Sequence, residues 1–523
     1  MTLSNEQQAA IDTVLTGKNT AIWAVAGAGK TTLLVALDEV LKNPEFLILS
    51  FSRELIEDIK PRLQYGLAST LHAWMLRACN EYVRVRNIPK QFQRKINRKH
   101  IVNEDLLDMI VHREVKILHN IDGKHIPAVK STEYFQDFYQ CKELVNVVRN
   151  KAISYNSHEY DKLMQFTPAY MTELVKTVLT RMTDNFLVRA ETDYTGLLYM
   201  PIIVPEIQEY IEQPIILAID EINDSNALFR QCYQWIKYED TQVVLVGDSA
   251  QTIHVWNGTE TNAVSILTEL FNCTVCTSRT TFRVPHKVIR WVNSSNLHTS
   301  ICANYTNNKG KLNRMSVNKM YNILSPGDVI LGRFNRHRSE KSLHDIAIDL
   351  LKLGKKIRLL GSEHIEQCQH IMSLSTNTHK NYLTSVLHGV ENERKNIAAI
   401  YGDNNPKITR LNEKLDTFKL YWNFYASSIN SKKTPQDFIE FLENMQTDSE
   451  NSITLSSIHR SKGKTFSNVY LVSVQYLYDT ICNQELTRDE RIEARNLLYV
   501  AVTRTNNILN IVGSELPDFI PLI

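Results

Sequence analysis

Residues Ala24–Thr32 read AVAGAGKTT, and this stretch decides the fold class. It follows an apolar, strand-like run, Thr20–Ala26, and precedes an apolar run of helical character, Leu33–Val40. A glycine-rich turn between a strand and a helix lets backbone N–H groups approach phosphates, and the helix N-terminus adds a favourable dipole. In this turn Lys30 would neutralise the β- and γ-phosphates, and the Thr31 hydroxyl would bind Mg²⁺. A chance glycine-rich turn is the weaker alternative, because GKT directly follows a strand.

A second apolar run ends in two acidic residues. Residues Ile216–Glu221 read ILAIDE, which places two carboxylates at the C-terminal edge of a sheet, where α/β proteins hold nucleotides. We expect Asp220 to hold Mg²⁺ and Glu221 to orient or deprotonate an attacking water. For an acidic pair alone, a solvated strand end is the default interpretation. Kinases, GTPases and ATPases all have both features. The glycine-rich loop and the acidic pair therefore predict nucleotide binding but do not identify a particular activity.

Strand-like apolar runs alternate with helical patterns along most of the chain, which predicts α/β architecture with parallel sheets. Two long stretches interrupt the alternation and read as helical. We therefore predict two α/β domains, each carrying a mainly helical insertion. The predicted boundaries are 1–72 with 196–280 for the first domain, 73–195 for its insertion, 281–361 with 451–523 for the second domain, and 362–450 for its short insertion.

Length and charge limit the class of protein. A chain of 523 residues predicts roughly three or four folding units. With 59 Lys and Arg against 57 Asp and Glu, the net charge of +2 neither demands nor excludes a nucleic-acid partner. No apolar run reaches the ~18 residues that a membrane span requires. The N-terminal residues are polar, so we expect a cytoplasmic protein that has no membrane partner.

Two further motifs are specific enough to suggest a family. Residues Val246–Gly258 read VGDSAQTIHVWNG, and Asn496–Arg504 read NLLYVAVTR. With the glycine-rich loop and the acidic pair, they follow the motif order of superfamily 1 DNA helicases. The chain resembles the UvrD/Rep/PcrA-like members, with some resemblance to F-box DNA helicases. This resemblance extends from Leu3 to Arg504 and implies two RecA-like P-loop domains that use ATP and Mg²⁺.

The resemblance assigns roles at the nucleotide. Gln7 would read the adenine edge, although Ser4 and Gln7 also fit a helix capping box, and both interpretations stay open. Phe282 would stack on adenine, and Arg504 would act as an arginine finger. The predicted nucleotide-binding residues are Gln7, Ala26, Gly27, Ala28, Gly29, Lys30, Thr31, Thr32 and Phe282, and the predicted metal-binding residues are Thr31 and Asp220. The predicted catalytic residues are Glu221, Gln251, Arg283 and Arg504.

The same resemblance implies contacts to DNA through aromatic and basic side chains. The alternatives are a buried strand-end phenylalanine for Phe51 and a core tryptophan for Trp256. The chain departs from the family pattern at Asn223, where Gln is usual. It also departs at Thr465, where a Glu usually meets the ribose hydroxyl, so ribose recognition there is an open question. The predicted DNA-binding residues are Phe51, His72, Trp256, His459 and Lys462.

A basic run lies in the first predicted insertion. Residues 84–99 contain seven Lys or Arg residues and no Asp or Glu. Such a run could follow a phosphate backbone and would make binding depend on salt. The alternative is a solvated helix face.

The resemblance to UvrD/Rep/PcrA-like helicases implies an ATP-dependent 3′–5′ DNA helicase that moves on single-stranded DNA, binds junctions of single strand and duplex, and serves DNA repair. One alternative is a translocase that strips proteins from single strands without unwinding. Another is a nucleotide-gated subunit of a repair or antiviral complex. We expect a monomer or weak oligomer, with residues 362–450 as a candidate surface for a protein partner.

Overall fold

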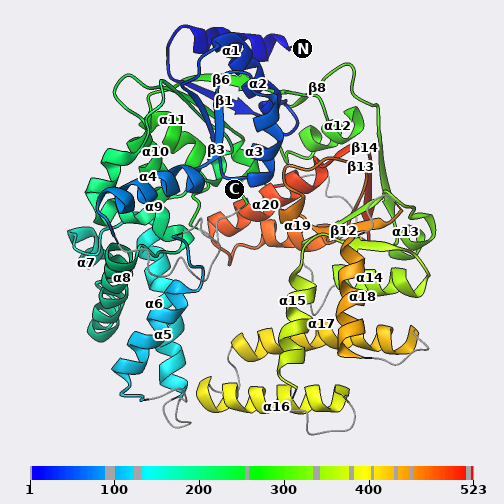
Figure 1. The fold of residues 1–523 in the computed structure, drawn as a ribbon. Coiled ribbons are helices and arrows are strands. Elements are labelled where there is room, and N and C mark those ends of the chain that lie inside the picture. Colours follow the sequence, from blue (N-terminus) through cyan, green and yellow to red (C-terminus); the bar gives the residue numbers. More distant parts are fainter. Residues whose placement is uncertain are drawn as a thin grey trace. The chain divides into compact units, whose positions relative to one another are not determined.

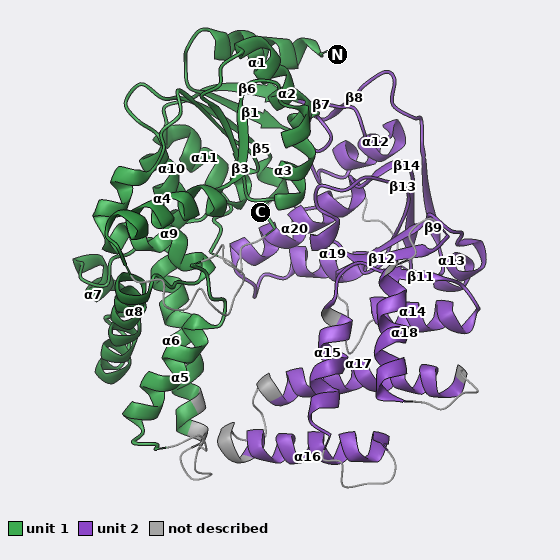
Figure 2. Ribbon diagram, in the orientation of Figure 1, with its two compact units in different colours: residues 1–24, 29–278 green, residues 25–28, 279–523 purple. Residues whose placement is uncertain are grey.

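A computed structural model of the chain describes residues 3–88, 101–122, 131–253, 258–298, 300–333, 342–375, 382–401, 406–428, 434–447, 451–513 and 520–521. The chain divides into two compact units (Figure 2). Unit 1 comprises Met1–Ala24 and Gly29–Ser278, and unit 2 comprises Val25–Ala28 and Arg279–Ile523. The short segment Val25–Ala28 groups with unit 2 although the sequence on both sides of it belongs to unit 1.

A six-stranded sheet forms the centre of unit 1, in the order β3-β2-β4-β5-β1-β6. Neighbouring strands pair in parallel throughout. The middle strands β2, β4 and β5 are almost entirely buried, which explains why their sequences are apolar without alternation. The strands are β1 (Thr20–Ala24), β2 (Phe46–Ser50), β3 (Leu67–Thr70), β4 (Ile216–Ile219), β5 (Gln242–Gly247) and β6 (Thr274–Ser278).

Helices connect these strands and pack beside the sheet (Figure 1). The α-helices are α1 (Asn5–Leu15), α2 (Lys30–Leu41), α3 (Arg53–Ile59), α10 (Ala227–Ile236) and α11 (Ala263–Leu270). Short 3₁₀ helices are η1 (Lys60–Arg62), η3 (Pro205–Tyr210), η4 (Ile222–Asp224) and η5 (Ser249–Gln251).

A group of helices lies between β3 and β4 in the chain and shares one apolar core with the sheet of unit 1. A buried ion pair ties two of them together, because Arg149 Nη1 lies 2.8 Å from both carboxylate oxygens of Asp193. Asp193 also caps α9 by accepting a hydrogen bond from the Gly196 N–H. The helices are α4 (Leu71–Val85), α5 (Leu106–Leu118), α6 (Ser131–Asn150), α7 (His158–Met164), α8 (Ala169–Arg189) and α9 (Tyr194–Ile203).

Unit 2 contains a second six-stranded parallel sheet, in the order β11-β12-β10-β13-β14-β9. A two-stranded sheet joins β7 (Thr280–Thr281) to β8 (Cys302–Ala303). The strands of the large sheet are β9 (Lys311–Met315), β10 (Val329–Gly332), β11 (Ile357–Leu359), β12 (Ile453–Ser457), β13 (Phe466–Leu471) and β14 (Thr505–Val512). Its helices are α12 (His286–Ser294), α13 (Val317–Ile323), α14 (Leu343–Lys352), η7 (His459–Ser461), α19 (Val474–Cys482) and α20 (Arg488–Val502).

A second helical group follows β11 and has an aromatic core. The rings of Phe418 and Phe438 flank Trp422 with centroid distances of 5.6 and 5.1 Å. These contacts make the group a packed subdomain. Its helices are α15 (Glu363–Ser373), α16 (Tyr382–Tyr401), α17 (Pro406–Ser428) and α18 (Pro435–Thr447).

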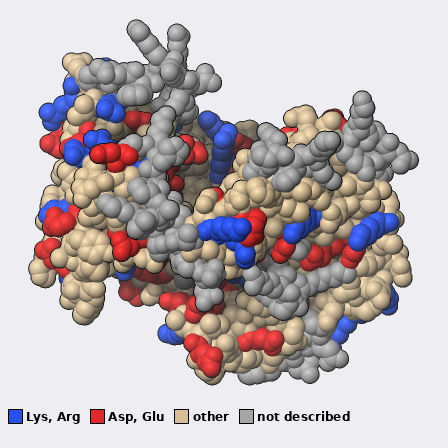
Figure 3. All heavy atoms as spheres, turned by 90° about the horizontal axis from the view of Figure 1, so that it is seen from below, with Lys and Arg blue, Asp and Glu red and all other residues tan. Residues whose placement is uncertain are grey.

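The predicted fold class is confirmed: two parallel sheets alternate with helices, and a helical group interrupts each α/β unit. On the face drawn in Figure 3, the Lys and Arg side chains lie close to Asp and Glu side chains, and uncharged residues cover much of the rest. Within the described ranges, no helix combines the length and the apolar character needed to cross a membrane.

Candidate functional site

The glycine-rich loop leads directly into α2. Gly29 caps this helix with φ +77°, and Lys30, Thr31 and Thr32 are its first three residues. Gly27 has φ +76°. Residues that carry a side chain rarely adopt this left-handed backbone conformation, so both positions favour glycine. The loop therefore has the shape that lets N–H groups face a phosphate.

Gln7 serves the helix cap and also lies beside this loop. The Ser4 N–H donates to Gln7 Oε1 at 2.9 Å, and the Gln7 N–H donates to Ser4 Oγ at 3.1 Å. A Cβ added at Gly29 would lie 2.8 Å from Gln7 Nε2, so the amide nitrogen is directed toward the loop. The capping box is present, and it leaves Gln7 Nε2 in a position that suits a nucleotide contact.

Lys30 lies among carboxylates. Its Nζ is 2.8 Å from Glu221 Oε1. Burial disfavours the charged ammonium, but the carboxylates of Glu221, Asp220 and Asp248 outweigh that effect and raise the pKa of Lys30. The lysine is therefore fully charged at neutral pH, as a residue that meets phosphates must be.

The acidic pair stands on a strained turn at the end of β4. Glu221 has φ 53° and ψ 41°, a left-handed conformation that costs a residue with a side chain roughly 1–3 kcal/mol. Asp220 Oδ1 accepts a hydrogen bond from the Glu221 N–H at 2.8 Å, and Asp220 is only 2% exposed. The turn aims the Glu221 carboxylate at Lys30.

Gln251 belongs to a buried polar network in unit 1. Its Nε2 donates to Asp248 Oδ2 at 2.7 Å. Asn223 joins both residues, because its Oδ1 accepts from the Asp248 N–H at 3.2 Å and its Nδ2 donates to the Gln251 carbonyl at 3.4 Å. The shorter Asn223, which stands where the family usually has Gln, thus links the acidic turn to η5 within unit 1.

The segment Val25–Ala28, which belongs to unit 2, contacts the residue that follows β7 and a side chain of α20. The Phe282 N–H donates to the Gly27 carbonyl at 2.8 Å, and the Ala26 N–H donates to the Tyr499 hydroxyl at 3.1 Å. A Cβ at Gly27 would lie 2.6 Å from Thr281 Oγ1, so glycine is required here for space as well as for backbone conformation. Ala28 is buried in the same segment.

The two predicted catalytic arginines differ in environment. Arg283 Nη1 donates to Thr465 Oγ1 at 3.2 Å, so the threonine that replaces the usual glutamate holds this guanidinium. Arg504 is 1% exposed, and its Nε donates to the Val500 carbonyl at 2.9 Å. Its Nη1 donates to the Lys464 carbonyl at 3.4 Å. As the structure stands, the Arg504 guanidinium serves the packing of unit 2.

An aromatic cluster in unit 1 brings together two predicted DNA-binding residues. Phe51 is 44% exposed, and its ring centroid lies 6.5 Å from that of His72. Burial lowers the pKa of His72 to about 4, so its imidazole is neutral at physiological pH. Phe229 packs under both rings, and Tyr194, which is 52% exposed, contacts His72 edge-on. The cluster therefore offers apolar ring faces and no charge.

Sequence reasoning missed Tyr194 and Phe229. The available signal for Tyr194 was local: an aromatic residue directly follows Asp193, the N-cap of α9. Phe229 lies in a helix whose aromatic residues look like ordinary core. Local sequence could not predict that Phe229 contacts Phe51 or that Tyr194 contacts His72, because each contact joins residues more than a hundred positions apart in the chain.

The remaining predicted DNA contacts lie in unit 2 or outside the described residues. His459 begins η7, and both its ring nitrogens lie within 3.4 Å of Arg333 Nη1. Lys462 follows η7 and is partly exposed. Trp256 lies outside the described residues, as does most of the basic run, 89–99.

Comparison with protein families defines the class. Residues 3–272 match the UvrD/REP helicase N-terminal domain, and residues 452–512 match the UvrD-like helicase C-terminal domain. The first match covers more than half of the chain, and the chain therefore belongs to the UvrD/Rep helicase family. It is accordingly a DNA helicase in the general sense, a DNA-binding ATP hydrolase. A search among curated proteins found no match.

Helicases of this family use ATP with a divalent metal. The Asp220 carboxylate and the Thr31 hydroxyl are oxygen donors of the kind that Mg²⁺ prefers, and Mg²⁺ usually takes only one or two carboxylates beside phosphates and water. Within the described part of the chain, no group of three His, Cys, Asp or Glu side chains forms a metal cage. The residues present fit Mg²⁺ bound together with a nucleotide.

Proposed function

We propose that this chain is a 3′–5′ DNA helicase that moves along single-stranded DNA and unwinds duplex at single-strand junctions, driven by ATP hydrolysis. The observation that carries the proposal is the 2.8 Å ion pair between Lys30, which begins α2 directly after the glycine-rich loop, and Glu221, which follows β4. It supplies a charged lysine for phosphate and a carboxylate for water within one small volume.

In this proposal the loop residues hold the nucleotide. Gly27 to Thr32 present N–H groups to the phosphates, Gln7 Nε2 reaches the adenine edge, and Phe282 stacks on the base. Lys30 exchanges its partner Glu221 for the β- and γ-phosphates. Asp220 and Thr31 would hold Mg²⁺, which supplies charge neutralisation at the phosphate oxygens when bound.

The exchange at Lys30 has a chemical consequence for Glu221. Once the ammonium pairs with phosphate, the carboxylate becomes able to orient a water and accept its proton. Gln251 and Arg283 report on the γ-phosphate through Asp248 and Thr465, the partners that they hold now. Arg504 acts as the finger by giving up its bonds to the Val500 and Lys464 carbonyls.

Bases of a single strand are the substrate of the aromatic surface. Exposed Phe51 stacks on a base, and neutral His72 and Phe229 keep its ring in place. Trp256, His459 and Lys462 complete the proposed contacts with DNA. Stacking makes no hydrogen bond to the edge of a base. This mode of DNA binding therefore suits a motor that moves along any DNA sequence.

Duplexes with either a 3′ or a 5′ single-stranded tail test the proposal. We expect ATP-dependent strand separation from the 3′-tailed duplex alone. Separation from the 5′ tail would reverse the polarity. Displacement of streptavidin from a biotinylated single strand without any strand separation would identify a translocase that strips proteins. ATP binding without hydrolysis would identify a nucleotide-gated subunit.

A further inference from the structure

Positive charge is segregated in one segment of unit 2. Residues 279–327 contain eight Lys or Arg and no Asp or Glu. The whole chain has 59 basic and 57 acidic residues, so the remainder holds 51 basic against 57 acidic residues. The near-neutral net charge of the chain thus hides a cationic segment. Of the residues in this segment, only Phe282 and Arg283 belong to the nucleotide and DNA sites described above.

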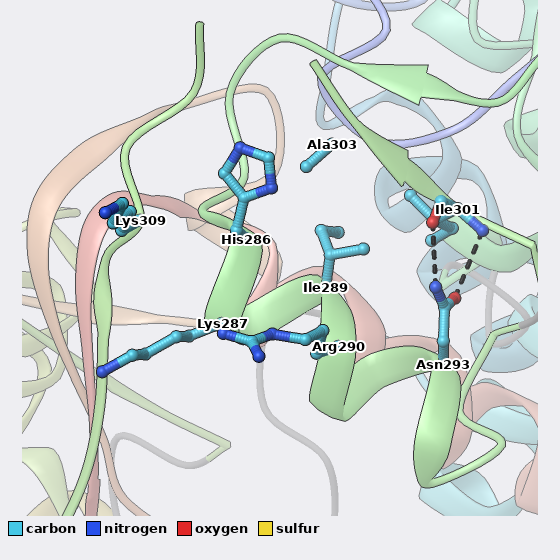
Figure 4. A pocket seen from close by; sticks show the side chains of 8 residues that line it. All are labelled: His286, Lys287, Ile289, Arg290, Asn293, Ile301, Ala303 and Lys309. Atoms are coloured by element: carbon cyan, nitrogen blue, oxygen red, sulfur yellow. Dashed lines mark hydrogen bonds between the residues drawn. The ribbon is translucent and has the colours of Figure 1, made fainter. Parts of the chain in front are cut away.

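Part of this segment lines an open pocket of about 490 Å³. Three cationic side chains, Lys287, Arg290 and Lys309, line it together with His286. Figure 4 shows Lys287 and Arg290 directed to the same side of α12, toward the loop that carries Lys309, while Ile289 faces Ala303. The pocket therefore combines a cationic rim with an apolar floor.

Backbone hydrogen bonds hold this arrangement in place. The N–H groups of His286 and Lys287 donate to the carbonyls of Asn308 and Lys309, each at 3.1 Å. At the other end, the Asn293 side chain pairs with both backbone groups of Ile301, at 2.8 and 3.2 Å. The loop that carries Lys309 and the strand that carries Ala303 are thus pinned beside α12, and the pocket needs no rearrangement to exist.

No acidic residue in the described ranges compensates the charge of the rim. Lys287, Arg290 and Lys309 are exposed, and none of them pairs with a carboxylate in the part of the chain that the structure describes. Elsewhere in unit 2, exposed Arg394 pairs with Glu391 at 3.1 Å. Three cations around one concavity, next to a helix N-terminus and without a carboxylate partner among the described residues, create a positive potential that attracts phosphate.

We propose that this pocket is a second binding site for single-stranded nucleic acid, separate from the motor's own contacts. Phosphates would bind Lys287, Arg290 and Lys309, and one unstacked base would lie on the floor of Ile289, Ile301 and Ala303. A base in a duplex is stacked between its neighbours, so a floor of this kind favours a single strand. Tyr305, 89% exposed on the adjoining loop, offers a ring face for the next base.

The site extends the proposed function but does not depend on it. None of Phe51, His72, His459 and Lys462 lines the pocket. A strand bound here would add to the hold on nucleic acid whether the motor unwinds duplex or only moves along it.

The test compares two triple variants of the full chain, both of which remove three positive charges. The pocket variant is Lys287→Gln with Arg290→Gln and Lys309→Gln. The control is Lys352→Gln with Lys395→Gln and Arg488→Gln, three exposed cations elsewhere in unit 2. Binding of a long, fluorescein-labelled oligothymidine is measured by anisotropy over a series of salt concentrations, and thermal unfolding confirms that both variants fold.

We expect the pocket variant alone to bind more weakly, and its slope of log K against log salt to be shallower by up to ~2, about 0.7 for each lost phosphate contact. ATP hydrolysis at saturating short oligothymidine should stay at the wild-type level. In wild-type protein, oligothymidine containing 4-thiothymidine should crosslink to the segment 286–309. The binding measurement requires no ATP hydrolysis. Its result can therefore be interpreted even if the proposed helicase activity is wrong.

Equal slopes in both variants, or equal losses in both, would overturn the site, as would crosslinks that avoid residues 286–309. Polyglutamate that binds wild-type protein as tightly as oligothymidine, and loses the same affinity in the pocket variant, would reassign the pocket to an acidic protein and refute the nucleic-acid proposal.

Discussion

Lys30 Nζ and Glu221 Oε1 lie 2.8 Å apart, and this ion pair joins the two motifs on which the nucleotide site depends. Lys30 starts α2, and Glu221 follows β4 in a left-handed turn. The parallel strands β1 and β4, which β5 separates, end at the same edge of the sheet, and this brings together residues that are far apart in the chain. The pair therefore connects the fold to the proposed chemistry.

Gly27 and Gly17 provide a matched test of the loop. Both have positive φ, but a Cβ at Gly27 would meet Thr281 Oγ1 at 2.6 Å, whereas nothing lies within 4 Å of a Cβ at Gly17. Gly17→Ala should lower the free energy of unfolding by ~1–2 kcal/mol and leave ATP hydrolysis intact. Gly27→Ala should reduce kcat/KM for ATP by ~10²-fold, because it displaces the phosphate-binding backbone. Equal activity of the two variants would contradict this role for the loop.

Phe51→Ala should weaken binding of single-stranded DNA by ~1–3 kcal/mol, the contribution of one stacked base. ATP hydrolysis without DNA should remain unchanged, since Phe51 is not part of the nucleotide site. Phe166→Ala is the control, because Phe166 is also an exposed phenylalanine of unit 1, at 92% exposure, and lies outside the cluster. If titrations of both variants with labelled oligothymidine gave the same affinity, Phe51 would not be a base platform.

His72 predicts a dependence of stability on pH. Its folded pKa of about 4 lies below the ordinary 6.5, so the unfolded chain binds more protons between these values. Stability should therefore decrease as pH falls from 6.5 toward 4. His72→Phe should make the thermal midpoint less sensitive to pH in this range. Wild-type and variant midpoints that fall in parallel would assign the dependence to other groups.

The Arg149–Asp193 pair predicts a large loss of stability when only one partner is removed. Arg149→Met should cost ~3–5 kcal/mol, because it leaves Asp193 buried without its cation. Adding Asp193→Asn should restore much of this loss, since the amide oxygen keeps the cap on α9. Arg394→Met, which breaks an exposed pair, should change stability by less than ~1 kcal/mol. Urea unfolding measures all three, and a double variant as unstable as Arg149→Met would refute the charge argument.

The sequence predicted those features that short motifs determine. The strand, turn and helix around Gly27 and Gly29 follow from local composition, and the two parallel sheets follow from the alternation of apolar runs with helical patterns. The left-handed backbone of Glu221 could not be predicted, because a side chain normally disfavours it and the surrounding fold imposes it. The burial of Arg504 was equally hidden, since its bonds to the Val500 and Lys464 carbonyls depend on how α20 packs.

ATP hydrolysis with and without single-stranded DNA, in wild-type protein and in Glu221→Gln, tests the central claim most directly. The account predicts strong stimulation by DNA in the wild type. In Glu221→Gln it predicts a loss of ~10²–10⁴-fold in rate, with nucleotide binding retained, because only the group that accepts the proton of water has changed. Absence of stimulation at every DNA length, or undiminished hydrolysis in Glu221→Gln, would contradict it.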